Sequence, residues 1–224
     1  MSASLIIDDT APWPRGHFPL LDRTAGVVHA VTTRAGPDFG TVGTAARTAV
    51  AAGEAARVIG LDHAAWVHQV HGGTVLAVDA PGLAGDADAL ITGTAGLAVL
   101  GRSADCPLIL LAGRDRADRP VVGFAHASWR ATVRGLAATT VARLRENLGA
   151  VPRTLRAAIA PSAGPCCYEV GDEVRQAAHQ RLGPGIAPCF LPHGERWIFD
   201  LWRANVGQLV AAGVPADRIT VARW

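Results

Sequence analysis

Three residues of types that bind soft metal ions occur at the ends of hydrophobic segments. Cys106 and His126 lie in apolar runs at 97–111 and 121–127, and His71 ends a third run. Short aliphatic runs of this kind are typical of buried strands. Two imidazoles and one thiol form the ligand set of a catalytic zinc site that keeps one position open. The sequence therefore predicts a metal centre where three strands end.

Each of these residues also has a purely structural interpretation. A free cysteine such as Cys106 is commonly a buried, unreactive thiol, and His126 also fits a core histidine. The spacing of the three matches no local zinc-finger motif. Strand alternation places His68 and His71 on opposite faces. We favour His71 as the functional histidine, because the two glycines that follow it leave room for a ligand.

Other residues are candidates for binding or for acid–base chemistry. Cys166 and Cys167 are predicted at a loop-to-helix boundary, where a helix N-terminus activates a thiol; a tight turn with one cysteine packed inward is the alternative. The candidate anion ligands are Arg34, Arg130 and Arg134. The candidate acids, bases, helix caps or partners of metal ligands are Asp88, Asp105, Glu169 and Asp172.

Hydrophobic periodicity and turn residues predict the elements that position these groups. Glycines at 72 and 73 predict an antiparallel hairpin between strands 65–71 and 74–79. The proline-rich residues 1–22 are expected to run over the surface. Further strands are predicted at 26–33, 89–92, 97–111, 121–127, 155–160 and 218–222, and helices at 44–60, 128–149, 170–182 and 200–213. This pattern favours an α/β fold with a mixed sheet or a pair of sheets covered by helices.

Composition excludes several classes of protein. The 224 residues, half of them hydrophobic, suffice for a large core, and the net charge of +2 comes without a basic stripe, so nucleic acid is not an expected partner. We find no run of 18 apolar residues and no signal peptide, and therefore expect no membrane association and a cytoplasmic location. The four cysteines, two of them adjacent, do not have the spacing of a secreted scaffold and are expected to be reduced.

Five motifs in order give the chain a resemblance to a known family. They are His-Gln-Val-His-Gly at 68–72, Gly-Asp-Ala-Asp-Ala-Leu-Ile-Thr at 85–92, Ala-Asp-Cys-Pro-Leu at 104–108, His-Ala-Ser-Trp-Arg at 126–130 and Gly-Pro-Cys-Cys-Tyr-Glu-Val-Gly at 164–171. Together they resemble the YfiH-type family. Its members were long described as multicopper polyphenol oxidases, or laccases, and are now described as zinc-dependent purine nucleoside phosphorylases with adenosine deaminase activity.

The resemblance implies a fold and a set of ligands. The expected fold is a single four-layer α/β/β/α domain over 26–224, with two mixed sheets between helices, after an N-terminal surface segment at 1–25. The family's metal ligands fall on His71, Cys106 and His126, which are also the expected catalytic residues. Zinc is the expected metal, with copper as the second choice.

The resemblance also implies substrates. We expect the chain to cleave adenosine and inosine with phosphate, and to deaminate adenosine. The candidate substrate contacts are Arg34, Gln69, Asp105, Arg130 and Cys167. A copper-dependent phenol oxidase, a thiol hydrolase using Cys106 or Cys167, and a non-catalytic or peptidoglycan-editing member are the alternatives. The sequence does not indicate an oligomer, and a monomer is compatible with it.

Departures from the family pattern bear on the pocket. Ser128 and Ala131 replace two glycines, and their Cβ atoms are expected to narrow the pocket or to forbid a positive φ. Ala160 replaces another glycine. A Ser-Leu-Asn-Leu motif of the family is absent between 35 and 45, and a C-terminal tail that relatives carry is absent after Trp224. We expect these differences to alter or reduce activity.

Overall fold

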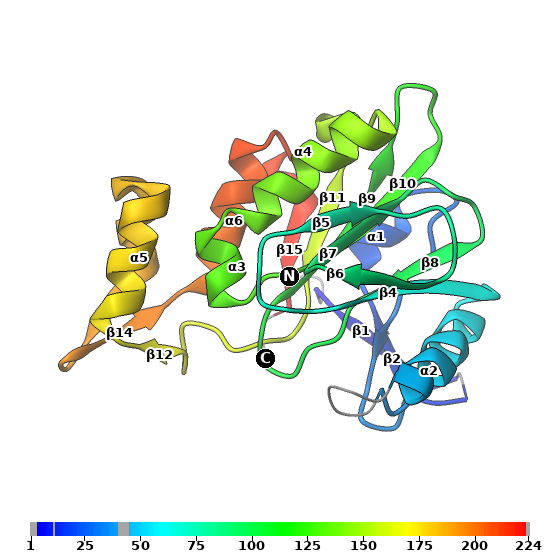
Figure 1. Ribbon diagram of the computed structural model, residues 1–224, viewed down its shortest axis with the longest axis horizontal. Helices are drawn as coiled ribbons and strands as arrows, with labels where there is room; N and C mark the ends of the chain where they lie inside the picture. The colour runs from blue at the N-terminus through cyan, green and yellow to red at the C-terminus, as the bar shows by residue number, and fades with distance from the viewer. Residues whose placement is uncertain (1–3, 11, 40–44, 223–224) are drawn as a thin grey trace.

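A six-stranded mixed sheet forms the centre of the molecule (Figure 1). The computed structural model describes residues 4–10, 12–39 and 45–222. The strand order of this central sheet is β15-β11-β9-β10-β7-β5. Its strands are β5 (Val75–Ala77), β7 (Ala89–Thr92), β9 (Leu108–Arg114), β10 (Pro120–His126), β11 (Arg156–Ile159) and β15 (Ile219–Val221). Strands β9 and β10 pair antiparallel over their whole length and form its middle.

A second, three-stranded sheet packs on one face of the central sheet. It has the order β6-β4-β8 and is parallel throughout, with β4 (His63–His68) between β6 (Gly82–Asp86) and β8 (Leu97–Leu100). Side chains alternate along β4. Ala65 and Val67 pack with Phe124 of the central sheet, whereas Ala64 and Trp66 pack against α2 (Ala45–Val58). The middle strand β4 is therefore covered on both faces, whereas the edge strand β6 is largely exposed.

Helices α4 (Leu136–Leu148) and α6 (Leu201–Ala211) cover the opposite face of the central sheet (Figure 1). Apolar residues at helical spacing on α4, such as Leu136, Val141 and Leu144, pack with Ile109 and Leu111 of β9. The layers are thus helix, central sheet, second sheet and helix α2. The mixed α/β, four-layer prediction is confirmed.

The N-terminal residues differ from the prediction of a surface segment. They form β1 (Ile6–Asp8), β2 (Arg15–His17) and α1 (Pro19–Asp22), and β2 pairs with β3 (Val31–Thr32). Phe18 and Leu21 are fully buried, against Ala112 and Ala158 of the central sheet. Residues before 26 therefore contribute to the core, because the side chains of Phe18 and Leu21, on either side of Pro19, point inward.

A smaller lobe follows β11 (Figure 1). It contains α5 and a three-stranded sheet of order β12-β14-β13. The stacked rings of Phe190 and Phe199, which oppose each other at one end of the β13–β14 pair, have centroids 4.2 Å apart. Val133 of α3 (Trp129–Val133), which precedes the lobe in the chain, packs into the same cluster and joins the lobe to the rest. The elements of the lobe are β12 (Glu169–Val170), α5 (Asp172–Leu182), a 3-10 helix at Pro184–Cys189, β13 (Phe190–His193) and β14 (Arg196–Phe199). Two further short 3-10 helices, at Pro152–Thr154 and Ala216–Arg218, lie just before β11 and β15.

The predicted hairpin at Gly72 and Gly73 is wrong. Strand β4 ends at His68, and the chain then crosses to the central sheet, where β5 pairs parallel with β7. The glycines form part of that crossover and not a two-residue turn. A strand over 26–33 is also wrong except at Val31–Thr32.

Two other predicted elements are divided. The helix at 128–149 is broken into α3 and α4 by Gly135, whose φ of +78° is the left-handed conformation that glycine adopts without strain. The run at 97–111 is split into β8 and β9 by the loop that contains Cys106. The helices predicted at 44–60, 170–182 and 200–213 and the strands at 155–160 and 218–222 are confirmed with small shifts at their ends. None of the helices in the described part of the chain is long and apolar enough to span a membrane.

Close packing at Gly113 gives a stability test. A Cβ atom there would lie 2.6 Å from Leu155 Cδ2 and 3.0 Å from the Leu155 backbone, so Gly113→Ala should lower the free energy of unfolding by about 1–3 kcal/mol. Gly207→Ala is the control, since Gly207 is exposed within α6 and nothing lies within 4 Å of the place that an added methyl group would occupy. That change should raise the free energy of unfolding by about 0.5–1 kcal/mol. Urea denaturation measures both, and an unchanged midpoint for Gly113→Ala would contradict the packing.

Candidate metal centre

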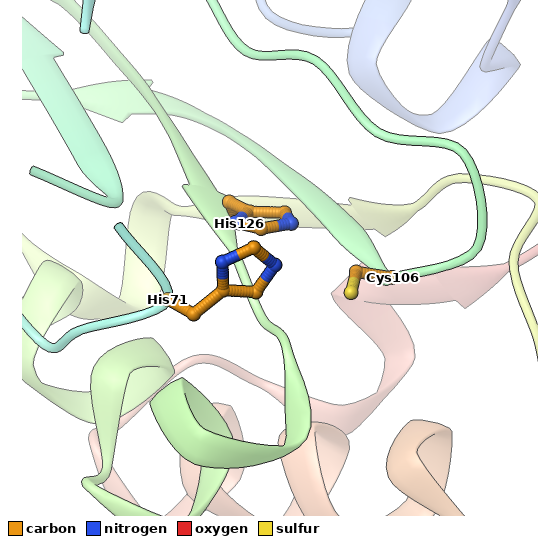
Figure 2. Close-up of side chains that lie close together, drawn as sticks. All are labelled: His71, Cys106 and His126. Atoms are coloured by element: carbon orange, nitrogen blue, oxygen red, sulfur yellow. The ribbon is translucent and has the colours of Figure 1, made fainter. Parts of the chain in front are cut away.

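Three crossovers from the second sheet to the central sheet converge at one place. The connection from β4 to β5 contains His71, the connection from β6 to β7 contains Asp88, and the connection from β8 to β9 contains Cys106. His126 ends β10 beside them. Figure 2 shows the two imidazoles and the thiol pointing toward one another. The site is therefore formed by the joins between the two sheets.

The three predicted ligand residues come together within the reach of one metal ion. One ligand atom from each of His71, Cys106 and His126 lies within 4.8 Å of the other two. The two imidazole rings meet edge to face, with centroids 5.0 Å apart and an interplanar angle of 71°. His126 is buried, Cys106 is half-buried and His71 is exposed. The cluster is thus shielded from solvent on the side of His126 and accessible to solvent on the side of His71.

Asp88 is the residue that organises this cluster. Its carboxylate is fully buried and accepts three hydrogen bonds. The backbone N–H of His71 donates to Oδ1 at 2.9 Å, that of Gly72 donates to Oδ2 at 2.6 Å, and His126 Nδ1 lies 3.0 Å from Oδ1. A carboxylate on Nδ1 fixes the ring and leaves Nε2 free for a metal. From the sequence, Asp88 was one of four acidic residues considered as an acid, a base, a helix cap or a hydrogen-bond partner of a metal ligand.

The backbone of His71 is held in an uncommon conformation. Its φ of +56° is positive, which few residues other than glycine adopt. The hydrogen bond to Asp88 holds one side of this peptide, and Arg134 Nη1 donates to the His71 carbonyl at 3.1 Å on the other. Strained backbone of this kind concentrates at functional sites. His68, the alternative, is exposed and lies 3.1 Å from Asp86 Oδ1, outside the cluster.

The loop that contains Cys106 is anchored at several points. Gln69 forms two hydrogen bonds with the Arg102 backbone, from Nε2 to the carbonyl at 2.7 Å and from the N–H to Oε1 at 2.8 Å. Ser103 Oγ donates to the Cys106 carbonyl at 2.7 Å. Gln69 therefore connects the crossover that contains His71 to the one that contains Cys106. Its side chain holds these two crossovers together, and its contact with substrate stays a prediction.

Hydrogen bonding shifts the ionisation of the buried pair. Burial by itself would raise the pKa of Asp88, but hydrogen bonds from the His126 ring and from two backbone N–H groups outweigh it and lower that pKa. Burial would likewise lower the pKa of His126, and the hydrogen bonds with Asp88 and Cys106 outweigh it and raise that pKa to about 9. A metal ion that binds this imidazole therefore competes with a proton.

The residues that replace family glycines fit the backbone without strain. Ser128 has a φ of −52° and begins α3, where its Oγ accepts a hydrogen bond from the Ala131 N–H at 3.3 Å. Ala131 and Ala160 are buried in apolar clusters, and neither has a positive φ. The expected conflict of Ser128 and Ala131 with a positive φ is wrong, because neither has one, and a serine is a favourable N-cap at 128. That their Cβ atoms narrow the pocket stays a prediction.

The other predicted site residues lie near the surface. Arg130 is exposed and its guanidinium stacks on Trp129 at 4.5 Å. Arg34 is exposed in the turn after β3, and Asp105 is exposed next to Cys106. Cys167 is exposed in a loop followed by β12, so the predicted helix N-terminus beside it is wrong.

Two of the remaining acidic candidates make structural contacts. Asp172 binds Arg175 and Gln176 within α5, and Glu169 pairs with Arg196 of β14. Residues 40–44, in the segment expected to lack the Ser-Leu-Asn-Leu motif, and residues 223–224 lie outside the described residues.

Comparisons with known proteins agree with the fold. The family model described as multi-copper polyphenol oxidoreductase laccase matches residues 21–224. The crystal structure of YlmD from Geobacillus stearothermophilus superposes with a TM-score of 0.75 at 25% identity, covering 99% of this chain and 88% of that one.

Two curated relatives carry enzyme names. A Deinococcus radiodurans protein named purine nucleoside phosphorylase is 38% identical over 75% of this chain and 62% of its own length. A protein from an unknown prokaryotic organism, named adenosine deaminase RL5, is 37% identical over 59% of this chain and 49% of its own length. The chain thus matches less than two thirds of the length of either relative.

Asp88→Asn tests the organising role of the carboxylate. An amide keeps the shape but presents an NH₂ group to one of the three donors, so we expect zinc affinity to fall by about 10–100-fold. Asp86→Asn is the matched control, because Asp86 also contacts a histidine but lies outside the cluster. Competition with a chromogenic chelator measures both dissociation constants. Equal affinities in the two variants would contradict the role of Asp88.

Proposed function

The chain belongs to the multi-copper polyphenol oxidoreductase laccase family, and we propose that it is a zinc-dependent enzyme that cleaves purine nucleosides with phosphate and deaminates adenosine. The observation that carries this proposal is the His71, Cys106 and His126 cluster with Asp88 behind it. The names of the two curated relatives supply the substrate class. Purine nucleoside and phosphate are the proposed partners.

The donor set fits zinc. Zinc in catalytic sites takes three protein ligands from imidazole, thiolate and carboxylate groups, and one further position stays open. His71, Cys106 and His126 provide such a set, and the hydrogen bond of Asp88 to His126 Nδ1 is the support that zinc-bound histidines usually have. Zinc bound there would supply a Lewis acid and a water of lowered pKa.

The residues of the chain have separable parts in the proposed reactions. Asp88 and Gln69 hold the ligand-bearing loops, so the ligand atoms stay in place when substrate enters from the exposed side of His71. Arg130 and Arg34 are the proposed phosphate contacts, because guanidinium groups bind phosphate oxygens in bidentate fashion. We assign Asp105 and Cys167 to the nucleoside, as they lie exposed on the two loops near Cys106.

The two proposed reactions require different groups. Deamination replaces the amino group at purine C6 by oxygen from water, so it needs a water held against the ring. Phosphorolysis requires phosphate beside C1′ and a proton for the departing base, and correct placement alone lowers that barrier substantially. One accessible centre, with the Arg134 guanidinium hydrogen-bonded to the His71 carbonyl, is compatible with both.

Copper is the second candidate metal, because the family description names it. Imidazole and thiolate groups are ligands for both copper and zinc. However, a multicopper oxidase needs many histidines, and this chain has eight, with no His-x-His pair. Its single methionine is Met1, so the chain offers no interior thioether as an axial ligand. We therefore propose zinc and not a phenol oxidase.

Removal of a ligand tests the function. His71→Ala and Cys106→Ala should each weaken zinc binding more than about 100-fold, beyond the effect of losing a supporting group. Both reactions should be lost, with the circular dichroism spectrum unchanged. Metal analysis and phosphate-dependent release of base from adenosine and inosine are the measurements.

His68→Ala is the control for that experiment. His68 is a nearby histidine outside the cluster, so this variant should keep its metal and its activity. Full activity in either ligand variant contradicts the zinc assignment. One zinc per wild-type chain without turnover of either nucleoside contradicts the proposed reactions but leaves the metal site intact.

A further inference from the structure

Two adjacent thiols lie exposed outside the metal cluster. Cys166 and Cys167 stand in the loop between β11 and β12, whereas Cys189 is buried. Neither belongs to the three-residue ligand cluster. The proposed function gives Cys167 a contact with the nucleoside, but it gives no role to Cys166 or to the two thiols as a pair.

The two sulfur atoms lie on the same side of the turn. The Cys166 thiol donates a hydrogen bond to Cys167 Sγ, with the sulfurs 3.3 Å apart. The backbone N–H groups of Cys167 and Tyr168 both donate to the Gly164 carbonyl, at 3.1 and 3.0 Å. This double hydrogen bond folds the loop and brings the side chains together.

Contacts with Trp202 of α6 also hold the turn in place. Gly164 is buried against the Trp202 ring so closely that a Cβ atom there would overlap it. Trp202 Nε1 in turn donates to Ser162 Oγ at 2.8 Å, which ties the start of the loop to α6. The thiol pair is therefore preorganised, and a ligand that takes both sulfurs needs to order little of the chain.

An ordinary disulfide does not fit this pair. Consecutive Cα atoms are about 3.8 Å apart, whereas disulfides span about 4.4–6.8 Å, so a bond between neighbours is strained and easily reduced. The hydrogen bond between the thiols raises the pKa of Cys166, and the Gly164 backbone together with that bond lowers the pKa of Cys167. Cys167 is thus the better nucleophile of a pair that stays reduced.

We propose that Cys166 and Cys167 form a vicinal dithiol site that binds trivalent arsenicals. A pyramidal arsenic(III) centre holds two sulfurs at nearly a right angle, which requires a short sulfur–sulfur distance such as the one between these thiols. Tetrahedral zinc, with zinc–sulfur distances of about 2.3 Å, needs a wider spacing of about 3.8 Å and further ligands. The part of the chain that the structure describes offers no third His, Cys, Asp or Glu ligand at this pair.

The reaction balances without a redox step. An organic arsenic(III) oxide reacts with two thiols: two S–As bonds form, both S–H bonds break, and the oxide oxygen leaves with the two protons as water. Arsenic remains trivalent and sulfur remains at the thiolate level. Cys106, as a single thiol in its cluster, does not provide the second sulfur that this chelate requires.

The test is titration of zinc-loaded, reduced protein with phenylarsine oxide, followed by intact mass spectrometry. The wild-type chain should gain one phenylarsenic group, which 2,3-dimercaptopropanol removes and a monothiol in equal amount does not. Cys166→Ser and Cys167→Ser should each reduce retention of the adduct at least about tenfold. Cys189→Ser, and Cys106→Ser titrated without zinc, should retain it.

Three other outcomes would contradict the proposal. Retention of the adduct in the Cys166→Ser/Cys167→Ser variant would place the reaction elsewhere. Loss of the adduct in Cys106→Ser would mean that the arsenical bridges Cys106 and a loop thiol. The proposal would also be overturned if the wild-type chain became two mass units lighter in air, as on forming a disulfide, and then did not bind the arsenical after mild reduction. Because both thiols are exposed, each single serine variant is expected to fold, and circular dichroism verifies this.

Discussion

The burial of one carboxylate imposes the main constraint on this structure. Asp88 has no exposed surface, and a buried charge of this kind is tolerated only when donors surround it. The donors are two backbone N–H groups from the crossover at His71 and the ring of His126 at the end of β10. To satisfy Asp88, the chain must accept a positive φ at His71 and a fixed orientation of the His126 ring. These are the two features that aim both imidazoles at one point.

The layered fold explains why the ligands converge. Each of β4, β6 and β8 belongs to the second sheet, and each is followed by a strand of the central sheet. Parallel pairing within the second sheet puts the ends of these strands at the same edge. The three crossovers therefore leave side by side, with His71, Asp88 and Cys106 on them, and Gln69 connects the first to the third. The site is a consequence of the sheet order and not of any one motif.

The sequence predicted those parts of the fold that depend on local patterns. Helices such as α6 follow from their own periodicity. The candidate ligands His71, Cys106 and His126 were marked by the apolar runs beside them and by the family resemblance, and the structure brings the three together. Parallel pairing of β4 with β6 and β8 was missed, because two glycines next to a neighbouring strand resemble a hairpin turn and the true partners are distant. The sequence did not separate the role of Asp88 from that of the other acidic residues, because what distinguishes Asp88 is its burial in the folded chain. Phe18 was missed because the prolines around it suggested a surface segment.

The central claim is that one metal ion is held by two imidazoles and one thiolate in the cluster that Asp88 supports. X-ray absorption at the zinc edge of the zinc-loaded protein tests it most directly. The structure predicts one sulfur at about 2.3 Å and two imidazole nitrogens at about 2.0–2.1 Å, with the remaining position taken by a light atom. A first shell with two sulfurs, or with none, would place the metal elsewhere and contradict this account.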